Sequence, residues 1–314
     1  MIHSGKGVHP SRRAWRERVV PSVRIGTIHL QGLRRRDVMD VDANIIMFDL
    51  HWPVGITAGL CLKRSSPVIW WGQGLGRRSL GRRIRAVLAV AGDGIILYAP
   101  SAREEMVEAG VSPHRVSVAT NTIWVNKPRD TSAAPKNQFI FVGRLQARKR
   151  VGELIRAFAR VHRSSPYNLL IVGGGEQRDE LIDLAKSQGV DTKVRFTGPI
   201  HDESILSELF RQSVAYVSPG AVGLGVLHAF AYGVPVITAR SQGHGPEVEW
   251  IVDGETGLFT DGTIRDLSTS LLRLSDDREW ARQLGRRAFE LYQRNATPEH
   301  MLQGFENAVR IAVG

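Results

Sequence analysis

The sequence predicts an α/β fold in which parallel strands alternate with helices in two domains. Three observations lead to this prediction: short apolar runs alternate with amphipathic helical patterns, one proline-containing stretch interrupts the alternation, and glycine-rich turns follow several apolar runs. Strands that alternate with helices in this way form parallel sheets covered on both faces. Ligands of such sheets bind beyond the carboxyl ends of the strands, so we expect functional residues in these turns.

The first half of the chain begins with a basic, poorly patterned stretch and then alternates between strands and helices. We expect short buried strands at 44–48, 68–71 and 94–98, with helices at 79–90 and 102–109. The stretch 126–137 has two prolines and no periodicity, which is typical of an interdomain linker.

The second half repeats the alternation with longer helices and then becomes helical. Past Gly257 the pattern is helical to the end of the chain, and no internal repeat appears. The expected strands are 138–142, 168–172, 194–197, 215–217 and 235–238. The expected helices are 151–163, 177–188, 205–212 and 226–232.

Composition fits a globular protein long enough for two domains. The chain has 314 residues, of which 42% are hydrophobic and 23% charged. Its only cysteine, Cys61, cannot form an internal disulfide, so we expect a core residue in a reducing compartment. No apolar run is long enough to cross a bilayer, and the Arg-rich start lacks the apolar centre of a signal peptide.

Positive charge is concentrated in the first domain. The formal net charge is +11, and residues 1–126 contain 18 Lys and Arg against 9 Asp and Glu. Such a field attracts anions, which at this point leaves nucleic acid, an acidic lipid and a phosphorylated substrate as candidate partners.

A basic turn follows the expected strand 138–142. Gly143 permits a tight turn there, while Arg144 and Lys149 can reach back toward phosphate oxygens at the end of the strand. A solvated basic loop would have the same composition, so the turn alone leaves both interpretations open. Arg148 and Arg150 are expected to be solvated neighbours.

The segment 219–238 reads P-G-A-V-G-L-G-V-L-H-A-F-A-Y-G-V-P-V-I-T. Its first glycines precede an amphipathic run that stops at Gly233, after which Pro235 opens a β-branched strand. We therefore expect backbone amides at the start of this helix to be free to bind an anion. Glycine turns also follow the strands ending at 172 and 197, although close packing explains such turns equally well.

Together these motifs resemble those of glycosyltransferase family 4. The pattern G-R-L-x-x-x-K begins at Gly143, an F-x-G-x-[VI] turn occupies 196–200, and a block similar to G-x-x-E-x-[IV]-x-x-G-x-T-G-x-[LF] spans 243–259. The segment 219–238 keeps the ending of the pattern E-G-F-G-L-x-x-x-E-A-x-A-x-G-x-P-V. Both glutamates of that pattern are replaced, by Gly220 and His228.

The resemblance implies a role for each turn. Arg144 and Lys149 are expected to hold the donor diphosphate as catalytic residues. His228 occupies the position of the ribose-binding glutamate, where it can make one hydrogen bond to a ribose hydroxyl; a structural histidine is the alternative. Glu247 is expected to be structural, with direct catalysis as the less favoured alternative. Further expected donor contacts are Gly143, Gly174, Gly198, Pro199, Ile200, Ala221, Val222, Gly223 and Leu224.

The N-terminal half resembles the family less closely. Gln73, in W-W-G-Q-G, stands where many members have a histidine near the acceptor, and His51 can supply such a group. We expect both on the acceptor side. Ser101 and Asn121 are similar to parts of two further family segments.

Two other signals compete for a function. Asp40 and Asp42 have the D-x-D spacing that holds metals in other glycosyltransferases, but they precede a strand rather than follow one, so no metal is expected. A basic run interleaved with apolar residues can dock to an anionic membrane or a lipid diphosphate, or it can be a solvated helix face. Its arginines are Arg77, Arg78, Arg82, Arg83 and Arg85.

The resemblance implies a GT-B fold with two doubly wound, Rossmann-like domains and a short N-terminal domain. We expect an acceptor-side domain at 1–126, a linker at 127–137, a nucleotide-sugar-binding domain at 138–297 and a final helix at 298–314 that crosses back. The implied reaction is sugar transfer with retention, without a cofactor, to a saccharide or lipid-linked hydroxyl. The expected location is the cytoplasm, either free or on the inner face of the cell membrane.

Three alternatives remain from the sequence alone. An inert GT-B subunit would keep the fold without binding a donor, and the replaced glutamates favour it. A nucleic-acid-binding protein would explain the charge, but no nucleic-acid module is visible and no nucleic acid is expected as a partner. A nucleotide-sugar epimerase of related fold would leave the arginine and lysine motif unexplained. The donor sugar, nucleotide and acceptor stay open.

Overall fold

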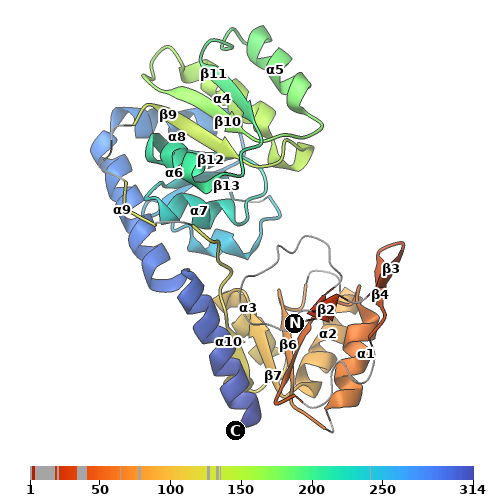
Figure 1. Cartoon of the computed structure of the whole chain (residues 1–314). Helices are drawn as coiled ribbons and strands as arrows, with labels where there is room; N and C mark the ends of the chain where they lie inside the picture. Colours follow the sequence, from red (N-terminus) through yellow and green to blue (C-terminus); the bar gives the residue numbers. More distant parts are fainter. Residues whose placement is uncertain are drawn as a thin grey trace. The chain divides into compact units, whose positions relative to one another are not determined.

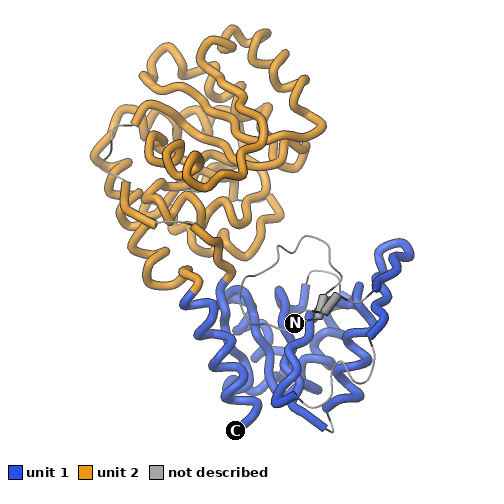
Figure 2. Tube along the Cα trace, in the orientation of Figure 1, with its two compact units in different colours: residues 1–120, 299–314 blue, residues 121–298 orange. Residues whose placement is uncertain are grey.

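The computed structural model describes residues 2–3, 18–19, 21–33, 41–63, 65–76, 79–125, 128–131, 134, 136–240 and 242–314. The chain forms two compact units (Figure 2). Unit 1 contains Met1–Thr120 and Glu299–Gly314, and unit 2 contains Asn121–Pro298. The division falls after Thr120 rather than after residue 126, because Ile123 and Val125 pack into the core of unit 2.

Unit 1 is built on a four-stranded parallel sheet. Its strands lie in the order β5 (Asn44–Met47), β6 (Val68–Gly72), β7 (Gly94–Leu97) and β8 (Val116–Val118). The helices are α1 (Pro53–Leu62), α2 (Ser79–Ala91), α3 (Pro100–Glu108) and α10 (Pro298–Val313), with a 3₁₀ turn, η2 (Pro113–Arg115). Two further pairs are the parallel β1 (Ile2–His3) and β2 (Arg18–Val19) and the antiparallel β3 (Ser22–Ile25) and β4 (Ile28–Gln31).

The alternation of side chains along β6 gives this sheet two covered faces. Trp70 packs in the cluster formed with α1, α2 and α3, whereas Ile69 and Trp71 pack in the cluster that contains residues of α10. Gly304 lets α10 lie close to β8, since a Cβ at this position would be 2.4 Å from the carbonyl oxygen of Val118. The C-terminal helix is therefore a structural part of unit 1.

Unit 2 is a six-stranded, fully parallel sheet (Figure 1). Its strands lie in the order β11 (Val194–Gly198), β10 (Asn168–Val172), β9 (Gln138–Val142), β12 (Ser213–Ser218), β13 (Val236–Ala239) and β14 (Gly257–Thr260). The helices are α4 (Val151–Val161), α5 (Arg178–Ser187), α6 (Glu203–Arg211), α7 (Gly225–Ala231), α8 (Ile264–Asp276) and α9 (Arg278–Asn295). Two 3₁₀ turns are η3 (Ala147–Lys149) and η4 (Pro246–Trp250).

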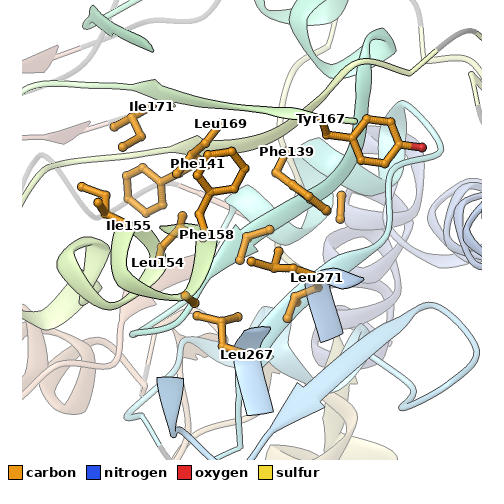
Figure 3. Close-up of a cluster of buried hydrophobic side chains, with 14 of the residues drawn as sticks. Phe139, Phe141, Leu154, Ile155, Phe158, Tyr167, Leu169, Ile171, Leu267 and Leu271 are labelled. Carbon is orange, nitrogen blue, oxygen red and sulfur yellow. The ribbon is translucent and has the colours of Figure 1, made fainter. Parts of the chain in front are cut away.

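Helices cover both faces of this sheet. Phe139 and Phe141 of β9 pack with α4, α5 and α8 in the cluster drawn in Figure 3, while Ile140 between them packs with α6 and α7 on the other face. α9 contributes to both clusters. Full burial of each such side chain contributes about 1.5–3 kcal/mol to folding.

The strand order locates the ligand-binding edge. Following the chain, the sheet grows from β9 to β10 and β11 on one side and then returns to place β12, β13 and β14 on the other. The order therefore reverses between β9 and β12, and ligands of doubly wound sheets bind beyond the carboxyl ends of strands at this switch point.

Most expected elements are confirmed. Helix α1 and strand β8 were not expected, and three expectations are corrected. The region after Gly257 is not entirely helical, because Gly257–Thr260 forms β14. The basic start contains the hairpin β3–β4, although Arg34–Arg36 and Asp40 lie outside the described residues. Cys61 is exposed rather than in the core, since α1 buries Ile56, Gly59 and Leu62 on the opposite face. Among the described residues, no helix combines the length and apolar character needed to cross a bilayer.

Candidate functional site

The two turns at the switch point are joined by backbone hydrogen bonds. One follows β9 and contains Gly143 to Arg150, and the other follows β12 and leads into α7. The amide of Gly220 donates to the carbonyl oxygen of Lys149 at 3.2 Å, and the amide of Ala221 donates to that of Arg148 at 3.0 Å. The sheet therefore places the basic turn directly against the glycine-rich turn.

Gly220 is required by this close approach. A Cβ atom built on Gly220 would lie 2.1 Å from the carbonyl oxygen of Arg148 and 2.7 Å from Cα of Lys149. No longer side chain can occupy this position without separating the two turns. Glycine at position 220 therefore allows these two turns to pack this tightly.

Lys149 links the same turns through its side chain. Its ammonium group donates a hydrogen bond to the carbonyl oxygen of Ala221. Burial, assisted by the nearby charge of Arg148, lowers the pKa of Lys149 below its ordinary value. An ammonium has three donors, so one bond to Ala221 leaves two for an anion.

The other basic residues of the turn have different surroundings. Arg144 and Arg148 are exposed, and Nε of Arg148 donates a weak 3.4 Å bond to Gln146. Arg150 is not a solvated neighbour as expected: its guanidinium bonds Glu153 at 2.6 Å and the carbonyl oxygen of Gly262 at 3.0 Å. Arg150 also has a left-handed backbone with φ of 54°, which ends η3 and starts α4.

The expectation of free amides along the second turn is wrong for three residues, the first of which is Gly220, bonded to Lys149. The amide of Ala221 is bonded to Arg148, and that of Val222 donates to Nδ1 of His244 at 3.2 Å. For the amides of Gly223 and Leu224, the described part of the chain supplies no acceptor. Any backbone contact to an anion therefore begins at Gly223.

The other expected glycines bring neighbouring turns together. A Cβ on Gly173 would lie 1.8 Å from the carbonyl oxygen of Gly143, so the turns after β10 and β9 touch backbone to backbone. The carbonyl oxygen of Gly174 accepts from the amide of Leu145 at 2.9 Å, and that of Gly198 accepts from Gly173 at 2.9 Å.

The turn after β11 completes this edge. Gly198 has a φ of 77°, which favours glycine. A Cβ added to Gly174 would lie 3.6 Å from Cδ of Pro199, which is an ordinary contact, so these two turns are neighbours. Ile200 packs on the α6–α7 side of the sheet. All the expected donor turns thus meet at the carboxyl edge of one sheet.

His228 belongs to a hydrogen-bonded group that the sequence did not predict. Its Nε2 lies 3.0 Å from Oε1 of Glu203, the same oxygen that accepts from the hydroxyl of Tyr232 at 2.6 Å. The ring also packs against Phe210, with centroids 4.7 Å apart. Nε2 of His228 therefore has a protein partner, as a structural histidine would. The described residues provide no partner for Nδ1.

Glu247 is buried beside the second turn. Only 3% of the residue is exposed, and its Oε1 accepts from the side-chain amide of Asn121 at 2.7 Å. A Cβ on Gly223 would lie 3.7 Å from the other carboxylate oxygen. Glu247 therefore supports the Gly223 backbone and ties it to the start of unit 2.

The expected acceptor-side residues lie at strand ends in unit 1. His51 follows β5, is exposed, and has Nδ1 2.6 Å from Oδ1 of Asp49. Gln73 directly follows β6 and is also exposed. Both are at the carboxyl edge of the parallel sheet of unit 1, where side chains are open to a ligand.

Helix α2 carries an apolar stripe on its outer surface. Leu80 and Val87 are 71% and 72% exposed, and Ile84 lies between them on the same side of the helix. Of the arginines, Arg82 pairs with Glu105 and Arg85 donates to the carbonyl oxygen of Leu75 at 3.1 Å. Arg77 and Arg78 lie outside the described residues. The exposed face of α2 is thus more apolar than the sequence indicated.

Comparison with known proteins identifies the family. A family profile described as glycosyl transferases group 1 matches residues 123–291, more than half of the chain. The chain is 31% identical over 191 residues to glycogen synthase of Mycobacterium tuberculosis, covering 57% of this chain and 45% of that protein. It is 31% identical over 225 residues to D-inositol 3-phosphate glycosyltransferase of Rhodococcus opacus, covering 65% and 49%.

Solved structures share the fold at low sequence identity. HepE of Anabaena in complex with UDP aligns with a TM-score of 0.67 at 18% identity, covering 86% of this chain and 79% of HepE. A mutant of S. aureus TarM, solved in complex with fondaparinux, alpha-GlcNAc-glycerol and UDP, aligns with a TM-score of 0.66 at 16% identity, covering 88% of this chain and 57% of that chain. These alignments confirm the expected GT-B class.

The matched region includes the turns described above, from the Gly143 turn to the Gly223 turn. The chain spans about half the length of the curated relatives it matches. With its two α/β units and a family profile over residues 123–291, the chain belongs to the group 1 glycosyltransferases.

Proposed function

We propose that this protein is a retaining glycosyltransferase of family 4 that moves a sugar from a nucleotide-sugar donor to a hydroxyl of a saccharide or lipid-linked acceptor. The main support is the switch-point arrangement, in which the turn containing Arg144 and Lys149 is bonded to the turn before α7. Basic side chains at this edge suit a diphosphate better than an uncharged ligand.

The proposed reaction needs only the substrates and this basic turn. The bond between the anomeric carbon and the diphosphate oxygen breaks, and a bond to the acceptor oxygen forms on the same face of the sugar. The acceptor proton passes to the departing diphosphate. Arg144 and Lys149 stabilise the negative charge that grows on the diphosphate, so the proposal is a metal-independent hexosyltransferase without a cofactor.

The remaining turns define the proposed donor contacts. The backbone of Gly143, Gly174 and Gly223 approaches the diphosphate and sugar, because these positions have no Cβ. Gly198, Pro199 and Ile200 are proposed to face the base, and Leu224 to contribute its amide. We take UDP as the first nucleotide to test, since related structures were solved in complex with it.

We assign the acceptor to unit 1. His51 and Gln73 are proposed to hydrogen-bond acceptor hydroxyls, because each is an exposed polar side chain at the end of a parallel strand. Cell-envelope polysaccharide or glycolipid synthesis is the proposed pathway, in keeping with relatives whose names include an inositol phosphate and a lipopolysaccharide glycosyltransferase.

An anionic membrane surface is the proposed docking partner of α2. The apolar stripe of Leu80, Ile84 and Val87 can enter the interface, while Arg83 lies beside it and the surrounding sequence has excess positive charge. We therefore place the protein in the cytoplasm, on the inner face of the cell membrane.

Titration calorimetry with a panel of nucleotide sugars tests this proposal. We expect one of the UDP, GDP or ADP sugars to bind, and the same donor to be slowly hydrolysed when no acceptor is present. Failure of the whole panel to bind would contradict the proposal and would favour an inert GT-B protein.

A further inference from the structure

Glu203 lies at the ligand-binding edge of unit 2. It is the first residue of α6, and it follows the turn after β11 by three residues. His228 belongs to α7, the helix that follows the Gly223 turn. Glu203 therefore joins two helices that both begin at the carboxyl edge of the sheet.

The two oxygens of this carboxylate have unequal surroundings. Oε1 is bonded twice, by Nε2 of His228 at 3.0 Å and by the hydroxyl of Tyr232 at 2.6 Å. For Oε2, the described residues contribute no hydrogen-bond donor, and 24% of the side chain is exposed. One oxygen fixes the carboxylate in place, and the other is available to a ligand.

The protonation states favour this arrangement. Burial opposes ionisation of Glu203, but the hydrogen bonds from His228 and Tyr232 outweigh it and lower the pKa of the carboxyl group. Burial, together with the hydrogen bond to Glu203, raises the pKa of Tyr232, so its hydroxyl stays a donor. When Nε2 of a neutral His228 donates to Glu203, Nδ1 becomes an acceptor.

We propose that Oε2 of Glu203 and Nδ1 of His228 together accept the two ribose hydroxyls of the donor nucleotide. The carboxylate that relatives carry at position 228 is thereby supplied from α6, with Tyr232 holding it in place. This inference rests on the proposed function, since it names the residues that recognise the nucleoside of that donor. Glu203 and His228 act in binding and specificity, not in the chemical step.

The arrangement also explains why a histidine suits position 228. A glutamate there would place a second carboxylate against Glu203, and like charges at hydrogen-bond distance repel. A histidine instead donates to Glu203 and keeps an acceptor for the ligand. The pair thus presents two acceptors to a diol, as a single glutamate does.

Calorimetry on the full chain tests the assignment. The probes are UDP, GDP and ADP, followed by the 2′-deoxy form of whichever binds best. The wild type should bind the ribonucleotide about tenfold more tightly than its deoxy form, because the hydroxyl bonds a charged acceptor. In Glu203→Gln this preference should fall below about threefold, mainly through weaker ribonucleotide binding.

Two further variants separate ligand recognition from a structural role. Glu208→Gln is the matched control, since Glu208 lies on the same helix but pairs with Arg211; it should keep the tenfold preference. The double variant Glu203→Gln/His228→Glu restores a carboxylate at position 228 and should regain the preference.

Each outcome is decisive. If Glu203→Gln weakens both nucleotides equally, or if the swap does not restore the preference, the ribose assignment is overturned while the proposed function stands. If the wild type binds none of the three nucleotides, the proposed function falls, and the assignment with it.

Discussion

The backbone amide of Gly220 donates a 3.2 Å hydrogen bond to the carbonyl oxygen of Lys149. Through this contact, the turn after β12 lies directly against the turn after β9, at the point where the strand order reverses. The side chain of Lys149 strengthens the same junction by bonding Ala221. The ammonium group of Lys149, which we propose binds the diphosphate, is therefore held in place by the backbone of the neighbouring turn.

Replacing Gly220 with alanine should disrupt this junction. The added Cβ would lie 2.1 Å from the carbonyl oxygen of Arg148, and backbone atoms cannot move aside without breaking the hydrogen bonds between the turns. We expect Gly220→Ala to lower stability by about 2–3 kcal/mol and nucleotide affinity by at least about tenfold.

Thermal unfolding and calorimetry measure the two effects of Gly220→Ala. Gly174→Ala is the control for stability, because its Cβ would make an ordinary 3.6 Å contact with Pro199. Equal melting temperatures for Gly220→Ala and Gly174→Ala would show that the two turns do not pack as described.

Lys136 should make the stability of the protein depend on pH. Burial lowers the pKa of its ammonium group to about 7, although Nζ donates to the carbonyl oxygen of Arg211 at 3.0 Å. Between this value and the ordinary 10.5, the unfolded chain binds more protons than the folded one, so stability rises with pH. Below about pH 7 the full cost of the buried charge is present.

Lys136→Met removes that cost. The unfolding free energy of the variant, relative to that of the wild type, should therefore be higher at about pH 6 than at about pH 9 by roughly 1–3 kcal/mol. Thermal unfolding of both proteins at the two pH values measures this difference. The exposed Lys186 offers a matched control, Lys186→Met. A variant advantage that grew with pH would contradict the assignment of Lys136 as a buried cation.

The apolar stripe of α2 should determine membrane binding. Leu80→Ser/Val87→Ser removes two exposed apolar side chains without changing charge, and it should reduce flotation with phosphatidylglycerol vesicles by at least about tenfold. Wild-type binding should also weaken with salt and be lost on phosphatidylcholine vesicles.

The control for this experiment lies on α10 in the same unit. Leu302 and Val313 are 57% and 53% exposed, so Leu302→Ser/Val313→Ser removes the same two side-chain types from an exposed surface. Vesicle binding that falls equally in both double variants, or that is absent in the wild type at low salt, would contradict docking through α2.

The sequence predicted the sheet of unit 2 better than any other part. The runs 138–142 and 168–172 place apolar side chains on both faces of the sheet. They form β9 and β10 with the expected bounds. Helix α1 was missed because Gly55 and Gly59 are poor helix formers. Packing overrides that preference: a Cβ on Gly59 would lie 2.7 Å from Trp70, so only glycine fits. β14, with four residues, is too short for a periodic signal.

The candidate site was predicted as a set of turns but not as a set of contacts. The positions of Arg144 and Lys149 at a strand end followed from local pattern. The bond of Ala221 to Arg148 and that of His228 to Glu203 join residues far apart in sequence, and no local pattern reveals such pairs. Glu203 did leave one signal: a charged residue just after a glycine and proline turn at a helix start.

The most direct test of the central claim is the rate of donor turnover in Arg144→Ala and Lys149→Ala. Each variant should lose at least about a hundredfold in rate, because each removes a positive charge that stabilises the departing diphosphate. Arg160→Ala, which removes an exposed charge from α4, should keep the wild-type rate. Unchanged turnover in both Arg144→Ala and Lys149→Ala would contradict the account.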